Sequence, residues 1–395
     1  MDVRAERFPL FDSLRAVAAL SVVLFHGAWQ QLLVFHPDNF LGRYAARLNV
    51  GVTVFFVISG FLLYRPFVAA RLAGGGFPRV GAYAWRRVLR IVPAYWVALT
   101  VVALALGLSY VFTASGVPRF YGFAQIYSAG DAARGLGQAW TLCVEALFYA
   151  LLPVWALAMR RVGVRRELVA LGGLAVAGLA FAAAVAVRYD PNLPGDVWAF
   201  MQLPNYLDAF AAGMALAVVS AWWAARESPA PEWVERHSWV PWAVALGAFL
   251  VAAQLGTVGE QTDREYFATH RLFVVVAVGL VAPAVFGSPG RGAVRRILSW
   301  RALLWVGLVS YGVYLYHVLA FDRLFTWGWE TDEPAGQVAR LLAGIAFTVA
   351  LAAVSYYAVE RPALKLKRRF ATAPAADQPG AVSAPAAPPA MTDRP

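Results

Sequence analysis

The chain has 395 residues, of which 60% are hydrophobic and only 14% are charged, a mixture too apolar for a soluble domain of this length. Its net charge of +11 comes from basic clusters between apolar stretches, which excludes the continuous basic face of a nucleic-acid-binding protein. Cys143 is the only cysteine, so the sequence excludes an internal disulfide and a cysteine-rich metal site. We expect neither a metal nor a permanently bound cofactor.

The apolar stretches predict membrane-spanning helices, because about 20 apolar residues cross the roughly 30 Å hydrocarbon core and a helix satisfies its own backbone polar groups. The first stretch, residues 9–33, is longer than a signal-peptide core and lacks a small-residue cleavage site, so we expect it to be retained. The expected fold is an all-α polytopic membrane protein with about ten transmembrane helices. The further spans are expected at residues 49–70, 89–111, 139–158, 167–187, 203–224, 239–256, 270–287, 302–321 and 338–358.

Basic residues predict the orientation of these spans. With the N-terminus in the cytoplasm, the inside segments hold 23 Lys and Arg residues and the outside segments hold nine. Because cytoplasmic loops are enriched in Lys and Arg, this bias places both termini in the cytoplasm. From about Thr372 the chain becomes Ala- and Pro-rich without apolar periodicity, which predicts a disordered cytoplasmic tail over residues 371–395.

Two ionisable residues lie within the first span, where a charge is unfavourable and therefore a candidate for function. Arg15 and His26 are eleven residues apart, a separation that returns a helix to within about 20° of its starting direction after a rise of about 16 Å. They are expected to share one face at different depths. An arginine that reaches the headgroups and a histidine hydrogen-bonded within the bundle are the alternative.

Further charged residues lie where the third span begins, at its cytoplasmic boundary, and within the fourth span. Arg87 and Arg90, in the string AWRRVLRIVPAYW, are three residues apart and project from one helix face. Clustered guanidinium groups suit a bidentate grip on phosphates, although topology signalling and lipid headgroup contact explain such a cluster as well. Glu145 is the only carboxylate of the fourth span, and we expect it at the depth of His26, where it would orient that imidazole as a general base. A structural pair without chemistry is the alternative.

Other small, aromatic and polar residues of the spans are expected to support this site. Ser59 and Gly60 allow close helix approach or backbone contact with a ligand. Ordinary helix packing is an alternative for each member of the set. The supporting residues are Ser59, Gly60, Tyr95, Trp140, Tyr149, Asp208, Ser310, Tyr311 and His317.

Six strings follow one another over about residues 8–363: FDSLRAVAALSVVLFH, FFVISGFLL, RRVLRIVPAYW, WTLCVEALFY, SYGVYLYH and VERPA. In this order they resemble the acyltransferase-3 family of bacterial integral membrane acyltransferases, although Ser13 stands where the family usually has glycine. The resemblance implies a membrane acyltransferase domain over residues 1–370, which crosses the bacterial cytoplasmic (inner) membrane several times.

The resemblance also implies a reaction and its site. An acyl group, usually acetyl, would pass from cytoplasmic acyl-CoA to a hydroxyl of a carbohydrate, a glycolipid or a secondary metabolite. His26 corresponds to the catalytic residue and Glu145 to the motif glutamate, while Arg15, Arg87 and Arg90 correspond to positions associated with donor binding or site integrity. His26 would either deprotonate the acceptor or carry the acyl group transiently. A transporter that exports a small or acylated molecule and a noncatalytic scaffold are the rivals, and turnover of acyl-CoA distinguishes them.

Overall fold

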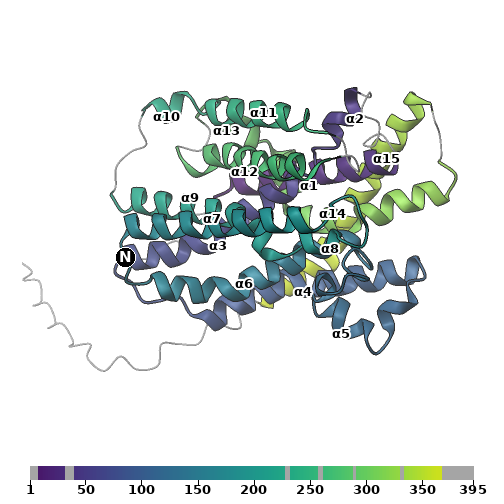
Figure 1. The fold of residues 1–395 in the computed structure, drawn as a ribbon, viewed down its shortest axis with the longest axis horizontal. Coiled ribbons are helices and arrows are strands. Elements are labelled where there is room, and N and C mark those ends of the chain that lie inside the picture. The colour runs from purple at the N-terminus through teal and green to yellow at the C-terminus, as the bar shows by residue number, and fades with distance from the viewer. Residues whose placement is uncertain are drawn as a thin grey trace, which may run out of the picture.

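The computed structural model describes residues 8–31, 40–226, 232–256, 261–287, 291–329 and 333–366. Within these ranges the regular elements are helices and no strand occurs, which confirms the all-α prediction. The long helices lie side by side, with their axes along the long direction of the molecule (Figure 1). The Ala- and Pro-rich tail predicted over residues 371–395 lies outside the described residues.

Nine helical stretches in the described part of the chain are long and apolar enough to cross a membrane. Helices of 20 or more residues rise about 30 Å, which matches the hydrocarbon thickness. The nine stretches contain α1 (Leu10–Gln30), α3 (Val50–Leu72, preceded by α2, Phe40–Ala45), α4 (Val80–Ala105), α6 (Trp140–Met159), α7 (Val164–Arg188), α9 (Leu207–Ala224), α12 (Asp263–Val285), α14 (Arg301–Thr326) and α15 (Pro334–Ser355).

The tenth predicted span, residues 239–256, forms a shorter apolar helix, α11 (Val240–Ala252). Its 13 residues rise about 20 Å, which is less than the hydrocarbon thickness. The helix packs along α12. The multi-pass bundle predicted from hydropathy is therefore confirmed, with one helix shorter than expected.

Short elements connect the long helices at their ends. Figure 1 shows α5 (Gly116–Tyr121) and α8 (Val197–Phe200) at the end of the bundle opposite the N-terminus, whereas α10 (Glu232–Arg236) lies at the same end as the N-terminus. This alternation follows the predicted order of inside and outside segments. The placement of the N-terminal end in the cytoplasm rests on the basic residues of the sequence and stays a prediction. The remaining short elements are η2 (Ser109–Phe112), η3 (Gln125–Tyr127), η4 (Gly137–Ala139), η5 (Leu203–Tyr206) and α13 (Ala293–Leu298).

The first helix, α1, lies inside the bundle. From Leu10 to Ala28 none of its residues is exposed, and it packs against α3 and α14. Glycine permits one of these close approaches, because a Cβ atom at Gly307 of α14 would clash with the carbonyl of Asp12. The two polar residues of α1, Arg15 and His26, are thereby held within the protein.

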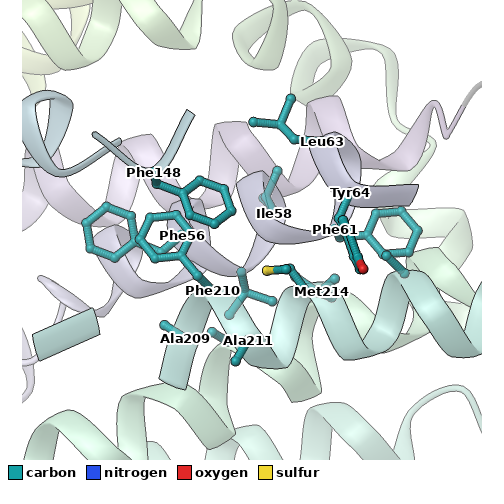
Figure 2. Close-up of a cluster of buried hydrophobic side chains, with 14 of the residues drawn as sticks. Phe56, Ile58, Phe61, Leu63, Tyr64, Phe148, Ala209, Phe210, Ala211 and Met214 are labelled. Carbon is teal, nitrogen blue, oxygen red and sulfur yellow. The ribbon is translucent and has the colours of Figure 1, made fainter. Parts of the chain in front are cut away.

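Helix α3 packs closely on α9 through two glycines. A Cβ atom at Gly60 would clash with the carbonyl of Phe210, and one at Gly213 would clash with the carbonyl of Val57. The small residues therefore bring the two backbones into contact, as is typical of membrane helix pairs. Aromatic side chains fill the space beside this crossing, as Figure 2 shows. The rings of Phe148 and Phe210 stack with centroids 4.0 Å apart, and Phe56 lies 4.8 Å from Phe210.

The last span changes its helical register before it ends. After α15 come one π-helical turn, η6 (Tyr356–Glu360), and the short helix α16 (Arg361–Lys365). Pro362 has no backbone N–H and cannot continue the ordinary hydrogen-bond ladder, which favours such a change. Both short elements pack on α4. This geometry buries the carboxylate of Glu360 against α4, since the residue is only 2% exposed.

Candidate active site

A cavity of about 110 Å³ lies between α1, α3, α4, α6 and α14. Five helices that are distant in sequence contribute polar side chains to its wall, and most of the predicted site residues are among them. The apolar part of the wall includes Val52, Phe55 and Ile91. The polar lining consists of Arg15, Ser59, Arg87, Arg90, Thr141, Glu145, Tyr149, Ser310, Tyr311 and Tyr314.

Glu145 is held by hydroxyl groups on both of its carboxylate oxygens. Ser59 Oγ donates to Oε1 at 2.7 Å, and the hydroxyl of Tyr149 donates to Oε2 at 2.6 Å. Tyr149 lies one turn after Glu145 on α6, so the helix geometry itself makes the second bond. Arg15 and Arg87 are close enough to interact electrostatically with this carboxylate. A buried carboxylate is stable only with such partners.

The three arginines of the cavity have different partners. Arg15 is paired with Asp12, one turn earlier on α1, at 2.7 Å. Arg90 is paired with Glu360 at 3.4 Å. Asp12 and Glu360 themselves do not line the cavity, whereas the arginines that they pair with do.

Arg87 differs from the other two, because its Nε is a buried donor without a hydrogen-bond partner in the described residues. A buried donor that lacks a protein partner is suited to an anionic ligand. The cavity therefore has the chemistry of an anion site, and phosphate groups satisfy arginine particularly well.

His26 does not line this cavity. Its Nδ1 lies 3.0 Å from the carbonyl oxygen of Val22 and 3.2 Å from Nε2 of His317 on α14. The two imidazole rings are tilted, with centroids 4.8 Å apart. His317 was predicted only as a supporting residue, and the structure makes it the side-chain partner of His26.

The structure does not bring His26 into contact with Glu145, the partner expected from depth in the membrane. The oxygens of Glu145 bond to Ser59 and Tyr149, whereas the ring of His26 bonds to His317. Counting residues along a helix predicts a level in the membrane but not which neighbouring helix a side chain faces, and this is why the expected pairing is wrong.

Tyr314 links the cavity with the histidine pair. It lines the cavity, and its ring centroid is 6.1 Å from that of His317. Its hydroxyl is 2.6 Å from Thr141 Oγ1 and also donates to the carbonyl of Gln138. Tyr314 and Thr141 were absent from the predicted set, although both stand in the strings SYGVYLYH and WTLCVEALFY.

Glu360 is the other residue missing from the predicted set. It lies in the terminal string VERPA, and the π-helical turn carries it to Arg90. The string was a signal for its importance, but no sequence pattern indicated that its partner would be an arginine about 270 residues earlier.

Four of the predicted supporting residues lie away from the cavity and stabilise the bundle instead. Gly60 forms the contact between α3 and α9 described above. Tyr95 is fully buried and donates to the carbonyl of Phe120 at 2.7 Å. Trp140 packs on the ring of Tyr206. Asp208 accepts a hydrogen bond from Arg271 at 2.7 Å, which gives it a counter-charge at the start of α9.

These features define a class of protein: a multi-pass membrane protein with a buried, arginine-lined cavity, a hydrogen-bonded carboxylate within it and a histidine pair beside it. Residues 9–357 match the sequence model of an acyltransferase domain, that of the acyltransferase-3 family. The chain belongs to this family and is an acyltransferase, which confirms the resemblance seen in its motifs and disfavours the transporter and scaffold alternatives.

Several curated proteins are similar to the chain over most of its length. Nodulation protein 10 of Rhizobium leguminosarum bv. viciae is 28% identical over 387 residues, which cover 90% of this chain and 93% of that protein. The exopolysaccharide production protein ExoZ of Rhizobium meliloti is 30% identical over 354 residues, 85% of this chain and 96% of the relative. No solved structure matches the chain.

The peptidoglycan O-acetyltransferase OatA of Listeria monocytogenes is 25% identical over 373 residues, which cover 90% of this chain but only 56% of that relative. The chain therefore spans about half the length of OatA, whereas it spans nearly all of the two rhizobial proteins.

Proposed function

We propose that the protein transfers an acyl group, in the first instance acetyl, from acyl-CoA to a hydroxyl of a carbohydrate, glycolipid or secondary metabolite at the bacterial cytoplasmic membrane. Membership of the acyltransferase-3 family supports the reaction class. The names of the relatives support a hydroxyl acceptor in the cell envelope, since OatA is a peptidoglycan O-acetyltransferase and ExoZ acts in exopolysaccharide production.

The observation that carries the donor assignment is the arginine-lined cavity, above all the unsatisfied Nε of Arg87. Coenzyme A carries a pyrophosphate and a ribose phosphate. A guanidinium group can donate two parallel hydrogen bonds to two oxygens of one phosphate. Arg87 and Arg90 hold these phosphates in this proposal, with Arg15 beside them. Glu145 keeps Arg15 and Arg87 in place by its charge, a role that differs from orienting the histidine.

His26 is the proposed catalytic residue. As a general base it takes the proton from the acceptor hydroxyl, whose oxygen then attacks the thioester carbonyl carbon. The tetrahedral intermediate collapses with cleavage of the C–S bond, and the departing sulfur receives the proton from the imidazolium. The products are the O-acyl ester and free coenzyme A.

A covalent route is the alternative for the same residue, in which His26 attacks the thioester and carries the acyl group before the acceptor arrives. Intact-protein mass spectrometry after incubation with acetyl-CoA alone separates the two routes. General-base catalysis predicts no acetylated histidine under conditions that permit turnover, whereas the covalent route predicts one acetyl increment on His26.

The acceptor is found by comparing glycan, lipid and small-molecule extracts of cells that contain the wild-type protein, the His26→Ala variant or no protein. The proposal predicts one product that is heavier by an acyl mass in the wild type and absent from the other two. A product that persists in the His26→Ala cells at the wild-type level would contradict the catalytic role of His26. If acyl-CoA remains intact in the presence of active membranes and acceptor extract, the proposal that acyl-CoA is the donor would be wrong.

A further inference from the structure

The histidine pair has a geometry that determines which nitrogen of His26 is basic, and this inference rests on the proposed role of His26. The partner, His317, is completely buried on α14, whereas His26 on α1 retains part of its surface. In the described residues no Asp or Glu side chain hydrogen-bonds to either ring. Burying a cationic imidazolium without a counter-charge is unfavourable, so both rings are neutral in the resting protein.

The hydrogen-bond partners of His317 define its tautomer. Its Nδ1 is 2.8 Å from the carbonyl oxygen of Tyr314 and 3.3 Å from that of Val313. A carbonyl oxygen only accepts hydrogen bonds, so Nδ1 carries the hydrogen. In a neutral imidazole the second nitrogen is then an acceptor, and Nε2 of His317 presents a lone pair to His26.

The tautomer of His26 follows from that of His317. Nδ1 of His26 faces two acceptors, Nε2 of His317 at 3.2 Å and the carbonyl oxygen of Val22 at 3.0 Å. It must therefore carry the hydrogen of the neutral ring, which leaves Nε2 of His26 unprotonated. We infer that His317 is a positioning residue that fixes His26 in the tautomer with Nε2 free to accept a proton.

The contact between Nδ1 and the carbonyl four residues earlier is not specific to His26. His237 and His270 make the same contact with the carbonyl four residues earlier, at 3.0 Å and 2.9 Å. Among the four histidines that the structure describes, only His26 and His317 also meet another imidazole. The bond from a second helix adds a directional partner and restrains the rotation of the His26 ring.

The arrangement serves the proposed reaction in both of its protonation states. Before transfer, Nε2 of His26 has the lone pair that a general base needs. After it has taken the hydroxyl proton, both nitrogens of His26 carry hydrogens, and Nδ1–H still donates to Nε2 of His317. His317 thus stabilises the imidazolium without receiving the proton, in the manner of the orienting group of a catalytic triad.

The tautomers are measured by ¹⁵N NMR on full-length protein labelled at histidine nitrogens and reconstituted in phospholipid nanodiscs. The chain has five histidines, so substitution of one at a time assigns the signals. We expect His26 to have a protonated Nδ1 and an unprotonated Nε2, and we expect His317→Leu to convert it to a mixture of tautomers. The exposed His237 is an internal control whose signals do not change. A protonated Nε2 in wild-type His26 would overturn the inference.

Kinetics of CoA release give the second measurement, with acetyl-CoA as donor and an acceptor-containing extract. His317→Leu removes the acceptor atom, and we expect kcat to fall about tenfold or more with KM for acetyl-CoA unchanged, because His317 does not line the donor cavity. His317→Gln has an amide oxygen that accepts from His26, and we expect it to restore most of kcat and the wild-type pH profile. A His317→Leu variant with wild-type kcat and pH profile would overturn the positioning role.

The two proposals fail in distinguishable ways. If His26→Ala retains activity while the NMR signals show the expected tautomer, the proposed catalytic role of His26 is wrong and the structural assignment stands. If His26→Ala is inactive but the tautomer does not respond to His317→Leu, the catalytic role stands and the assignment of His317 is wrong.

Discussion

Two cavities of this bundle differ in size and in the polar groups that line them, and the smaller one contains the clustered arginines and the buried carboxylate. The larger is a groove of about 1140 Å³ between α9, α10, α11 and α12, whose wall includes Trp223, Val244 and Val275. Arg295 also borders it, but this guanidinium already donates to the carbonyls of Pro283 and Phe286.

The arginine-lined cavity has about a tenth of that volume but presents Arg87 with a donor that no described protein atom satisfies. In a membrane protein, empty space between helices is readily filled by lipid chains and identifies no site by itself. Volume alone therefore does not locate the chemistry, and the clustered arginines and the carboxylate of the smaller cavity mark it as the candidate site.

Removing both phosphate-binding arginines should have the largest effect. A hydrogen bond to a charged group contributes about 1.5–3 kcal/mol. We therefore expect Arg87→Ala combined with Arg90→Ala to lower kcat/KM for acetyl-CoA by about a hundredfold or more, mainly through KM. Arg86→Ala is the matched control, because Arg86 adjoins Arg87 in sequence but is exposed and lines neither cavity. A double variant as active as the Arg86→Ala control would show that acetyl-CoA does not bind in this cavity.

Neutralising the carboxylate of the cavity should have a smaller effect. Glu145→Gln retains the shape of the side chain but removes the charge that interacts with Arg15 and Arg87. We expect a loss of about 10- to 30-fold in kcat/KM for acetyl-CoA, which corresponds to about 1.4–2 kcal/mol. Tyr149→Phe deletes one hydrogen bond to the same carboxylate and should lose less. The two losses are compared by steady-state CoA release, and equal losses would contradict a role for the charge.

Glu360 does not line the arginine-lined cavity and affects it only through its ion pair with Arg90. We expect Glu360→Gln to weaken the placement of Arg90 and to raise KM for acetyl-CoA about fivefold, close to 1 kcal/mol, while kcat changes little. Arg361→Gln changes the adjacent, exposed residue and should leave KM as in the wild type. If both variants have the same KM, the ion pair from the π-helical turn has no part in donor binding.

A change in the larger groove should have the smallest effect on activity. Val244→Phe adds an apolar ring to that groove. We expect kcat/KM to remain within about twofold of wild type, since the helices α11 and α12 contribute nothing to the arginine-lined cavity. A loss as large as that of Glu145→Gln, in a variant with an unchanged melting temperature, would show that the groove also takes part in the reaction.

Hydropathy predicted the bundle well because the length of an apolar run is read directly from the sequence and the thickness of the membrane that it must cross is nearly constant. It overestimated the span at 239–256, where α11 has 13 residues. The polar residues within spans were also good indicators, since Arg15, Arg87, Arg90 and Glu145 do meet in one cavity.

The partners of those residues were less predictable, because they depend on which helices are neighbours and how each is rotated. His26 and Glu145 were expected to pair because of similar depth, yet α14 supplies the partner of His26. Asp208 similarly pairs with Arg271 across two helices. Glu360 reaches Arg90 only through a π-helical turn, which shifts the register and which no pattern in the string VERPA indicated.

The central claim, that His26 catalyses transfer from acyl-CoA in this bundle, is tested most directly by thiol release. Purified protein in phospholipid nanodiscs is supplied with acetyl-CoA and acceptor extract, and free CoA is measured for the wild type and His26→Ala. The two proteins are first shown to have the same melting temperature. We expect the variant to lose about a hundredfold or more of the turnover, since a positioned general base contributes about 10²–10⁴ in rate. Equal rates of CoA release from both proteins would contradict the account.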